Sequence, residues 1–240
     1  MNGGDRVRAL TSGDVAWMAD VMAERRARYQ EYSPVFWRPA AHARDVHAPY
    51  LASCVASARF VGYRTTEGFI LGERQSSIGF IDDFAVVRDD AWISDGLQLL
   101  VAAWSQLRDE EAESLRVVTA RRDDAKVLML KSAGLSVGES WWVRPGDDRA
   151  QDAQIFGPVA AAGIEALVIP APPVYDPGGP VLLVTSIDSA DRVVEVPLLA
   201  EEQGAVLAIL PCPPISDLSR AAQEAGFDET TQYYVGQLHA

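Results

Sequence analysis

The chain has 240 residues, of which 48% are hydrophobic and 23% are charged. This composition is typical of a globular protein with a sizeable core and excludes an intrinsically disordered chain. The 21 Lys and Arg against 34 Asp and Glu give a net charge of −13, which repels nucleic acids and anionic membranes. The densest basic run, Glu24–Arg28, lies in a helical pattern and contains an acid, as solvated helix faces do. We therefore expect no nucleic-acid partner and no membrane partner.

Cysteine and histidine usage argues against a metal or redox centre. Cys54 and Cys212 lie far apart without a CxxC spacing, so we expect two free thiols in a reducing compartment. His42, His47 and His239 are scattered without ligand-type spacing, and solvated or core histidines are the expectation. The N-terminal residues lack an apolar secretory core, and no apolar run approaches the roughly 20 residues that span a bilayer. We expect a cytoplasmic protein.

The first part of the chain switches between period-two and helical spacing of its apolar residues. In chain order the pattern predicts strand 6–10, helix 11–32, an aromatic loop 33–40 between two prolines, helix 49–58, two strands within 59–75 about a turn at 65–68, strand 77–87, helix 97–112, strand 115–120, helix 123–134 and strand 136–143. Gly134 is expected to end its helix as a left-handed C-cap.

A polar stretch with Pro and Gly, Pro145–Gln154, reads as a linker, so we expect domains at 1–148 and 149–240. The second part predicts a hairpin within 162–187 about a turn at 176–180, a helix-like segment 191–204 interrupted by Pro197, strand 205–211, helix 216–226 and strand 228–238.

The end of the second part repeats the end of the first. A shift of 92 residues places Ala133–Gly134 on Ala225–Gly226 and Trp141–Trp142 on Tyr233–Tyr234 without a gap. We therefore interpret the second part as a tandem copy of the last third of the first: strand, helix, strand, helix, strand.

These segments resemble the GNAT superfamily of acetyl-CoA-dependent N-acetyltransferases. The stretch "VRALTSGDVAWM" is similar to the family's opening "IRxATxxDxxxI", and "DDAKVLMLKSAGL" is similar to its "NxxAxxLYxxxGF" helix. Between them, "DFAVVRDDAWISDGLQLL" resembles the fourth strand, the pyrophosphate loop and the third helix. The resemblance covers residues 6–144 as a whole domain and 182–238 as a half. It implies an α/β fold (α+β in some schemes), a mixed twisted sheet flanked by helices, followed by a smaller half domain. It also implies transfer of an acetyl group from acetyl-CoA to an amine.

The expected co-substrate site follows the fourth strand. A strand that feeds a glycine-containing turn into a helix presents free backbone N–H groups and the positive end of the helix dipole to a phosphate. The resemblance places pantetheine along residues 85–87 and pyrophosphate above residues 92–97. The expected co-substrate residues are Ala85, Val86, Val87, Trp92, Ile93, Ser94, Gly96 and Leu97.

Two carboxylates are the candidates for chemistry. Acetyl transfer needs a group that accepts a proton from the amine, and the family often uses a carboxylate on or beside its fourth strand. Asp82 and Asp83 lie in that strand, and at period two one of them must face inward. Either is a candidate base. An inward Asp that only accepts hydrogen bonds from backbone N–H groups is an equally good interpretation.

The family's proton donor is commonly a tyrosine in the helix before the last glycine. That position falls on Leu130 here and on Ala222 in the second part, and neither side chain donates a proton. Tyr32, Tyr50, Tyr63 or a water are the substitutes, and the sequence does not choose among them.

The aromatic loop between the first two helices corresponds to part of the family's acceptor wall. Tyr32, Phe36, Trp37 and Arg38 are therefore the candidate acceptor-binding residues, with core packing as the equal alternative. The expected acceptor is a small-molecule or peptide amine, and homodimerisation is left open.

Two rival hypotheses remain. The first is a catalytically inactive GNAT-like module that binds a ligand or partner, because the loop lacks the family's Arg and first glycine and Leu130 replaces the tyrosine. The second is an interaction protein whose half domain mimics a dimer partner, with an acidic surface suited to basic partners.

Overall fold

The computed structural model of the chain describes residues 7–146, 156–161 and 163–237. The chain forms two compact units, and both are discontinuous. The first unit comprises Met1–Arg25, Arg44–Val137 and Tyr233–Ala240, and the second unit comprises Arg26–Ala43 and Gly138–Gln232. The expected boundary at 148/149 and most of the expected linker lie outside the described residues, so that division stays a prediction.

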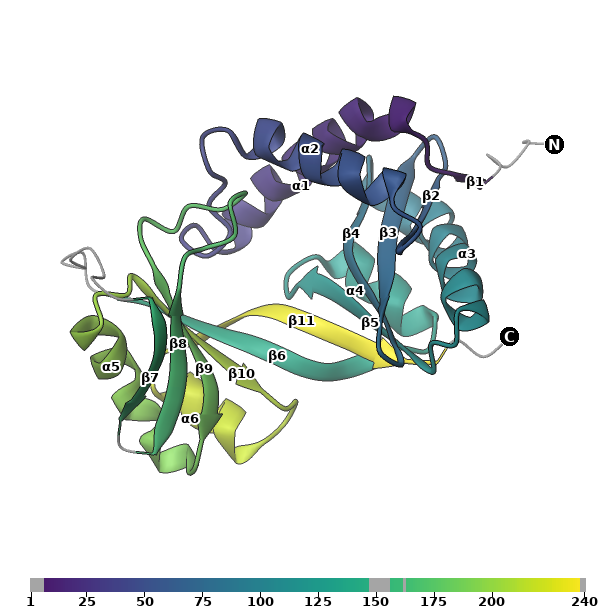
Figure 1. The fold of residues 1–240 in the computed structure, drawn as a ribbon. Helices are drawn as coiled ribbons and strands as arrows, with labels where there is room; N and C mark the ends of the chain where they lie inside the picture. The colour runs from purple at the N-terminus through teal and green to yellow at the C-terminus, as the bar shows by residue number, and fades with distance from the viewer. Residues whose placement is uncertain (1–6, 147–155, 162, 238–240) are drawn as a thin grey trace. The chain divides into compact units, whose positions relative to one another are not determined.

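The elements follow the predicted order closely (Figure 1). Up to the linker they are β1 (Arg8–Ala9), η1 (Ser12–Asp14), α1 (Val15–Tyr32), α2 (Ala43–Ala56), β2 (Phe60–Arg64), β3 (Gly68–Gln75), β4 (Ile78–Val86), η2 (Asp89–Trp92), α3 (Asp95–Asp109), β5 (Ser114–Ala120), α4 (Asp124–Ser132) and β6 (Ser136–Pro145). After it come β7 (Gly157–Ala161), β8 (Ile164–Ile169), β9 (Val181–Ile187), η3 (Ala190–Glu195), α5 (Val196–Glu202), β10 (Leu207–Cys212), α6 (Asp217–Glu224) and β11 (Asp228–Gly236).

Two details differ from the sequence prediction. Strand β7 was not predicted, and helix α2 begins at Ala43, six residues before the expected start at Pro49. Proline usually stops a helix because it lacks an N–H and crowds the preceding turn, yet α2 continues through Pro49. Pro197 behaves as expected: it lies in the first turn of α5, where no N–H is required.

The sheet of the first unit has the strand order β1-β2-β3-β4-β5-β11. Strands β1 to β4 are antiparallel and β5 is parallel to β4. Successive side chains of β3 enter different clusters: Phe69 and Leu71 pack with α1 and α2, whereas Ile70 packs with α3 and α4. The helices therefore cover both faces of this sheet.

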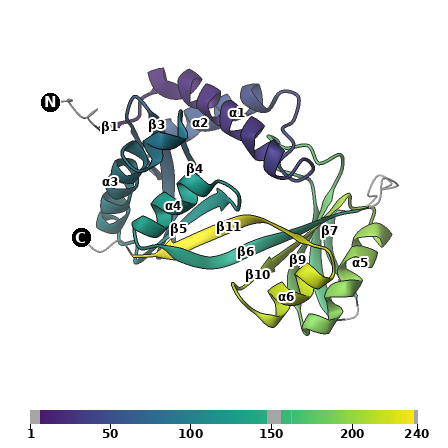
Figure 2. The same cartoon turned by 180° about the vertical axis from the view of Figure 1, so that it is seen from behind.

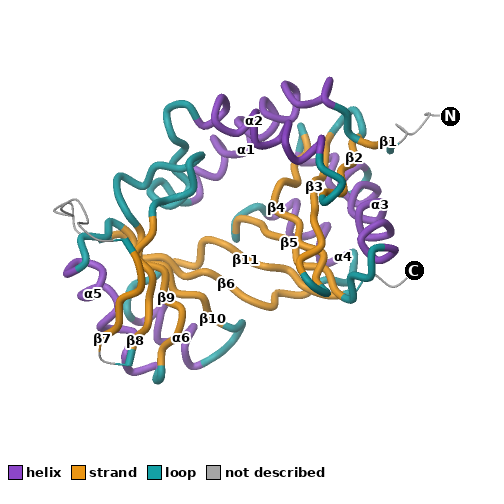
Figure 3. The backbone as a smooth tube through the Cα atoms, in the orientation of Figure 1, coloured by secondary structure: helices purple, strands orange, loops and turns teal. Residues whose placement is uncertain are grey.

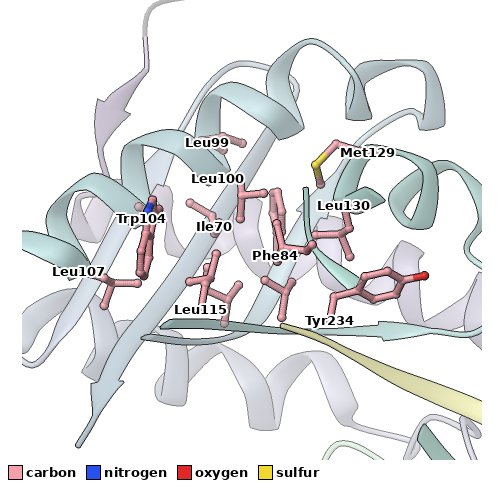
Figure 4. Packing of buried hydrophobic residues seen from close by; sticks show 14 of the residues in the cluster. Ile70, Phe84, Leu99, Leu100, Trp104, Leu107, Leu115, Met129, Leu130 and Tyr234 are labelled. Carbon is pink, nitrogen blue, oxygen red and sulfur yellow. The ribbon is translucent and has the colours of Figure 1, made fainter. Parts of the chain in front are cut away.

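The cluster under α3 and α4 is the larger core of the first unit. Figure 4 shows Phe84 and Ile70 of the sheet among Leu100, Trp104 and Leu130 of the helices. Each fully buried side chain of this size contributes roughly 1.5–3 kcal/mol by leaving water. This packing fixes β4 and α4, which carry the candidate site.

The second unit is also a sheet with helices packed against it. Its strand order is β11-β6-β10-β9-β8-β7, and β10 is parallel to β9 and antiparallel to β6. Helices α5 and α6 pack on one face (Figure 2), where Ala208 and Leu210 of β10 enter their cluster. On the other face Leu207 and Ile209 pack with Phe36 from the aromatic loop.

Strands β6 and β11 contribute to both units (Figure 3). The sequence suggested that 136–143 closes the first part and 228–238 the second. Instead, β11 lies beside β5, and β6 lies beside β10 with Val143 opposite Ile209. The last strand of the chain thus lies beside the first unit's β5, and β6 pairs with β10 of the second part, which periodicity cannot reveal.

Helices α4 and α6 end in the same way. Gly134 has φ 84° and Gly226 has φ 78°, both in the left-handed region that glycine adopts at least cost. The residue after each glycine donates its N–H five residues back, from Leu135 to Leu130 and from Phe227 to Ala222. The predicted left-handed C-cap at Gly134 is confirmed.

Among the described residues, no helix is both long and apolar enough to cross a bilayer. Cys54 and Cys212 are buried free thiols, as expected.

Candidate functional site

Strand β4 carries a β-bulge at the two candidate carboxylates. Ile70 pairs with Phe84 and Gly72 pairs with Ile81, so Asp82 and Asp83 together face Leu71. The extra residue breaks the alternation of the strand. Asp83 turns inward and is only 8% exposed, whereas Asp82 is exposed. The expectation that one of the pair faces inward is confirmed for Asp83.

His47 of α2 is the partner of this buried carboxylate. Its Nε2 lies 3.2 Å from Asp83 Oδ2, and both residues are buried. An aspartate and an imidazole at this distance form a pair that holds or passes a proton, and the carboxylate orients the ring. Sequence reasoning treated His47 as a solvated or core histidine because the three histidines show no ligand-type spacing, and the structure places it in the core.

Tyr50 lies one turn further along α2 and connects this pair to the surface. Its ring stacks on His47 with centroids 5.6 Å apart, and the residue is 51% exposed. Burial of its hydroxyl and a hydrogen bond with Cys54 raise the pKa of Tyr50, so the phenol keeps its proton at neutral pH. Burial likewise raises the pKa of the Cys54 thiol.

Of the three tyrosines named as substitute donors, Tyr50 is the one brought to Asp83. Tyr63 donates its hydroxyl to Gln106 Oε1 at 2.7 Å, and Tyr32 lies in the second unit beside Tyr29. Leu130, at the family's tyrosine position, is fully buried in the core (Figure 4).

Strands β4 and β5 separate just before the bulge. Their parallel register runs from Ile78 opposite Ser114 to Ile81 opposite Val117, although both strands continue. Val87 N–H donates to Glu67 O of the neighbouring chain segment. In an antiparallel pair the backbone N–H and C=O groups of successive residues point alternately to the two sides of the strand. Since Val87 points toward Glu67, the backbone groups of Phe84 and Val86 point the other way, toward β5.

The ammonium of Lys126 lies between the separated strands. From α4 it donates to Phe84 O at 3.1 Å and to Val118 O at 2.9 Å, one acceptor on each strand. Burial lowers the pKa of Lys126 to about 8, against the opposing attraction of Asp123. We refer to the separation of β4 and β5 beyond Ile81 and Val117 as the β4–β5 splay.

The expected pyrophosphate loop is built around a buried indole. Trp92 is fully buried against Phe84, and the guanidinium of Arg25 lies 5.2 Å from its ring. A Cβ on Gly96 would lie 2.7 Å from the Trp92 ring, so this packing requires glycine there.

The charge around this loop is mainly negative. Asp89 and Asp90 begin η2 and Asp95 begins α3, while Arg25 bonds Asp89 and Asp123, each at 3.2 Å. Of the other expected co-substrate residues, Ala85 and Val86 are buried in β4, and Ile93 and Ser94 are exposed.

The aromatic loop belongs to the second unit. Trp37 is buried between Tyr29 and Tyr175, with ring centroids 5.2 and 5.3 Å away, and Phe36 packs on Trp37. Arg38 donates to the backbone oxygen of Asp176. Phe36 and Trp37 are therefore packing residues of that unit, and an acceptor-binding role for this loop stays a prediction.

The second unit has a counterpart of the bulge without its carboxylates. Ala166 pairs with Val184 and Glu165 with Ser186, which leaves Thr185 as the extra residue of β9, and its hydroxyl donates to Glu165 O. A surface pocket after β9 is lined by three acids, one arginine and one serine: Asp188, Asp191, Glu195, Arg192 and Ser189. Within residues 7–146, 156–161 and 163–237, no group of three or more His, Cys, Asp or Glu could hold a metal ion.

The structure adds two residues to the candidate site that sequence reasoning did not select, His47 beside Asp83 and Lys126 beside Phe84. They lie 36 and 42 positions from their contacts at Asp83 and Phe84, so no local spacing marks them. A signal for Lys126 was present, because it occupies the alanine position of the family's "NxxAxxLYxxxGF" helix.

Comparison with known proteins identifies the fold. No protein-family model matches the sequence, and no curated protein matches it. Two similar solved structures are each described as a "putative acetyltransferase". The one from Thermoplasma acidophilum has TM-score 0.59 and 11% identity over 96% of this chain and 98% of that one. The one from Pyrococcus horikoshii has TM-score 0.55 and 10% identity over 99% and 92%.

A third solved structure is a GCN5-related N-acetyltransferase from Sphaerobacter thermophilus. It has TM-score 0.57 and 8% identity, and covers 100% of this chain and 98% of that one. The chain therefore has the GNAT fold, in an arrangement that these structures share over nearly their whole length.

Proposed function

We propose that the chain is an N-acyltransferase that transfers an acetyl group from acetyl-CoA to the amine of a small molecule or peptide. One observation carries the proposal: in a GNAT fold, the β4 bulge holds the buried Asp83–His47 pair next to the point where β4 and β5 separate. Bulges of this kind are frequent beside active sites, where they redirect a side chain.

The residues fit the pantetheine arm of acetyl-CoA but oppose the charge of its pyrophosphate. The backbone groups of Phe84 and Val86 that face the β4–β5 splay suit the amide groups of a pantetheine arm. The start of α3 offers backbone N–H groups to a pyrophosphate, but Asp89, Asp90 and Asp95 oppose its charge. When bound, acetyl-CoA supplies the activated acyl group.

The chain's own residues supply the proton transfer. Asp83 holds the imidazole of His47, and this pair accepts the proton that the acceptor's ammonium must lose so that its neutral amine can attack the thioester carbonyl. The exposed Asp82 adds negative charge beside the bulge, which favours a cationic acceptor. Tyr50 offers a phenolic proton at the surface end of the same helix face.

A second candidate is a GNAT-like module that binds a ligand without chemistry. It is favoured by Leu130 in place of a proton-donating tyrosine and by Lys126 in the β4–β5 splay. Both candidates use the same part of the first unit, so binding and turnover must be measured separately.

The decisive experiment is titration of the full chain with acetyl-CoA by calorimetry and thermal shift, followed by a panel of primary amines. A ligand that binds the native state must stabilise it, so saturating acetyl-CoA should raise Tm and release or absorb heat. Absence of both effects rejects the transferase. Binding without acetylation of any amine in the panel favours the second candidate.

A further inference from the structure

Lys126 is an unusual element of the first unit because its charge is buried. The residue is 2% exposed, and its ammonium donates to two neutral carbonyl oxygens, Phe84 O and Val118 O. Burying an ammonium is costly, and two neutral acceptors compensate for only part of that cost. A side chain kept in such a position calls for a role besides packing.

The position of the ammonium is specific to the β4–β5 splay. Val118 directly follows the last parallel pair, Ile81 opposite Val117, and Phe84 follows the bulge on the other strand. The ammonium therefore bridges two strands that have ceased to pair with each other. Its acceptor Phe84 O is one of the β4 backbone groups that point into the splay.

The second unit has an equivalent break in strand pairing, and the matching helix position there carries no charge. There the parallel register of β9 and β10 ends at Leu183 opposite Ile209, again just before a bulge. The residue 92 positions after Lys126 is Leu218, which packs against the apolar core of that unit. The matching helix of the second unit therefore has an apolar residue where the first unit has a buried ammonium.

We propose that Lys126 is the residue that determines whether the β4–β5 splay accepts an acyl-thioester arm. In the free chain its ammonium donates a hydrogen bond to Phe84 O. The acyl-thioester arm enters the splay only when Nζ gives up this hydrogen bond. This inference rests on the proposed function, because it concerns the same splay. It gives Lys126 a competitive role toward acetyl-CoA, unlike a purely structural bridge.

Protonation gives a second way to test the competition. Burial lowers the pKa of Lys126 to about 8, so the ammonium becomes a neutral amine, a weaker donor to carbonyls, between pH 7 and pH 9. The other charged groups that act on it are Asp123 before α4, Arg25 of α1, and Asp82 and Asp83 of β4. Acetyl-CoA should therefore bind wild type more tightly at pH 9 than at pH 7.

The test is calorimetric titration of the full chain with acetyl-CoA at pH 7 and pH 9, using wild type, Lys126→Ala and the control Lys131→Ala. Lys131 is exposed on the same helix, so its removal changes net charge equally without touching the splay. We expect Lys126→Ala to bind about tenfold more tightly than wild type at pH 7, with the pH dependence lost. Lys131→Ala should match wild type at both pH values.

Three outcomes overturn the inference or separate it from the proposed function. Equal or weaker binding by a folded Lys126→Ala overturns the inference and leaves the transferase standing if wild type binds. Binding by Lys126→Ala alone supports the inference and rejects wild type as a transferase at this site. Binding by neither rejects both. If Lys126→Ala does not fold, Lys126→Met removes the charge at similar length, and it should also abolish the pH dependence.

Discussion

The first and second units each contain a break in parallel strand pairing followed by a bulge, and the side chains around this feature differ between them. In each, two parallel strands pair for only a few residues and the outer strand then bulges. The bulge residues are Asp82 and Asp83, which share Leu71, in β4 but Thr185 in β9. The backbone thus provides a gap at both places, and only the first unit adds an acid, an imidazole and a buried ammonium.

The faces opposite the bulges also differ. In the first unit α1 and α2 cover the face of Phe69 and Leu71, and α2 brings His47 to Asp83. In the second unit the cluster on the corresponding face includes Phe36 from a loop. A helix can present a titratable side chain toward the bulge, whereas this loop supplies aromatic packing. The comparison locates the candidate chemistry in the first unit.

The largest expected effect comes from removing the acid of the first unit. Asp83→Asn should lower kcat for whichever amine is acetylated by about 100-fold or more, because it removes the proton acceptor and the orienting charge on His47. Its affinity for acetyl-CoA should hardly change. Steady-state kinetics and calorimetry measure the two quantities.

The matched control lies in the other unit. Thr185→Val removes the side-chain hydroxyl at the equivalent bulge and should leave turnover unchanged. Unchanged turnover in both Asp83→Asn and Asp82→Asn would remove the base assignment. A loss in Thr185→Val would break the comparison between the units.

Restoring the family's tyrosine should cost stability instead of adding activity. Leu130 is fully buried and well packed, so Leu130→Tyr should lower the free energy of unfolding by about 1–3 kcal/mol through overpacking. Urea unfolding measures the loss. A stable Leu130→Tyr variant with faster turnover would show that the missing hydroxyl limits the reaction.

The two helix ends should respond alike, because they use the same glycine conformation. Gly134→Ala and Gly226→Ala should each cost about 1–2 kcal/mol, the price of a left-handed non-glycine residue. A Cβ meets nothing within 4 Å at Gly134 and only Arg144 at 4.0 Å at Gly226, so crowding plays no part. Gly13→Ala is the control, with room for a Cβ and no positive φ. Unequal losses at 134 and 226 would contradict the equivalence of the two ends.

The smallest effect concerns acid stability of the first unit. Hydrogen bonds from Arg8, with further ones from Thr11 and Arg64, hold the pKa of Asp14 well below its usual range. A lowered folded pKa stabilises the chain above the unfolded value of about 3.9, and this stabilisation is lost as pH falls. Asp14→Asn should cost about 1 kcal/mol at pH 7, and this cost should begin to shrink below about pH 4 and vanish only as pH falls through the lowered folded pKa.

Hydrogen exchange resolved by unit is the measurement for Asp14. Wild type should lose protection in the first unit as pH falls from 5 to 3, and Asp14→Asn should show less of this change. An identical acid response in the two proteins would mean that other groups govern acid stability.

Several features of the site follow from local pattern. Period two along β4 required one of Asp82 and Asp83 to face inward, and the motif at α4 identified Leu130 as a position without a proton donor. The pattern could not choose between the aspartates, because the bulge that decides it depends on pairing with β3. It also could not select His47, since no local spacing marks it and its contact with Asp83 lies 36 positions away.

The sequence alone determined the order of the helices and strands apart from β7, the glycine helix ends, the free thiols and the resemblance to the GNAT fold. These depend on periodicity and on backbone preferences of single residues, which act over a few positions. Tertiary structure decided that β11 lies beside β5, that His47 meets Asp83, and that Lys126 fills the β4–β5 splay. Hydrogen bonds between distant segments set these contacts, and no local pattern encodes which distant partner a strand or side chain will meet.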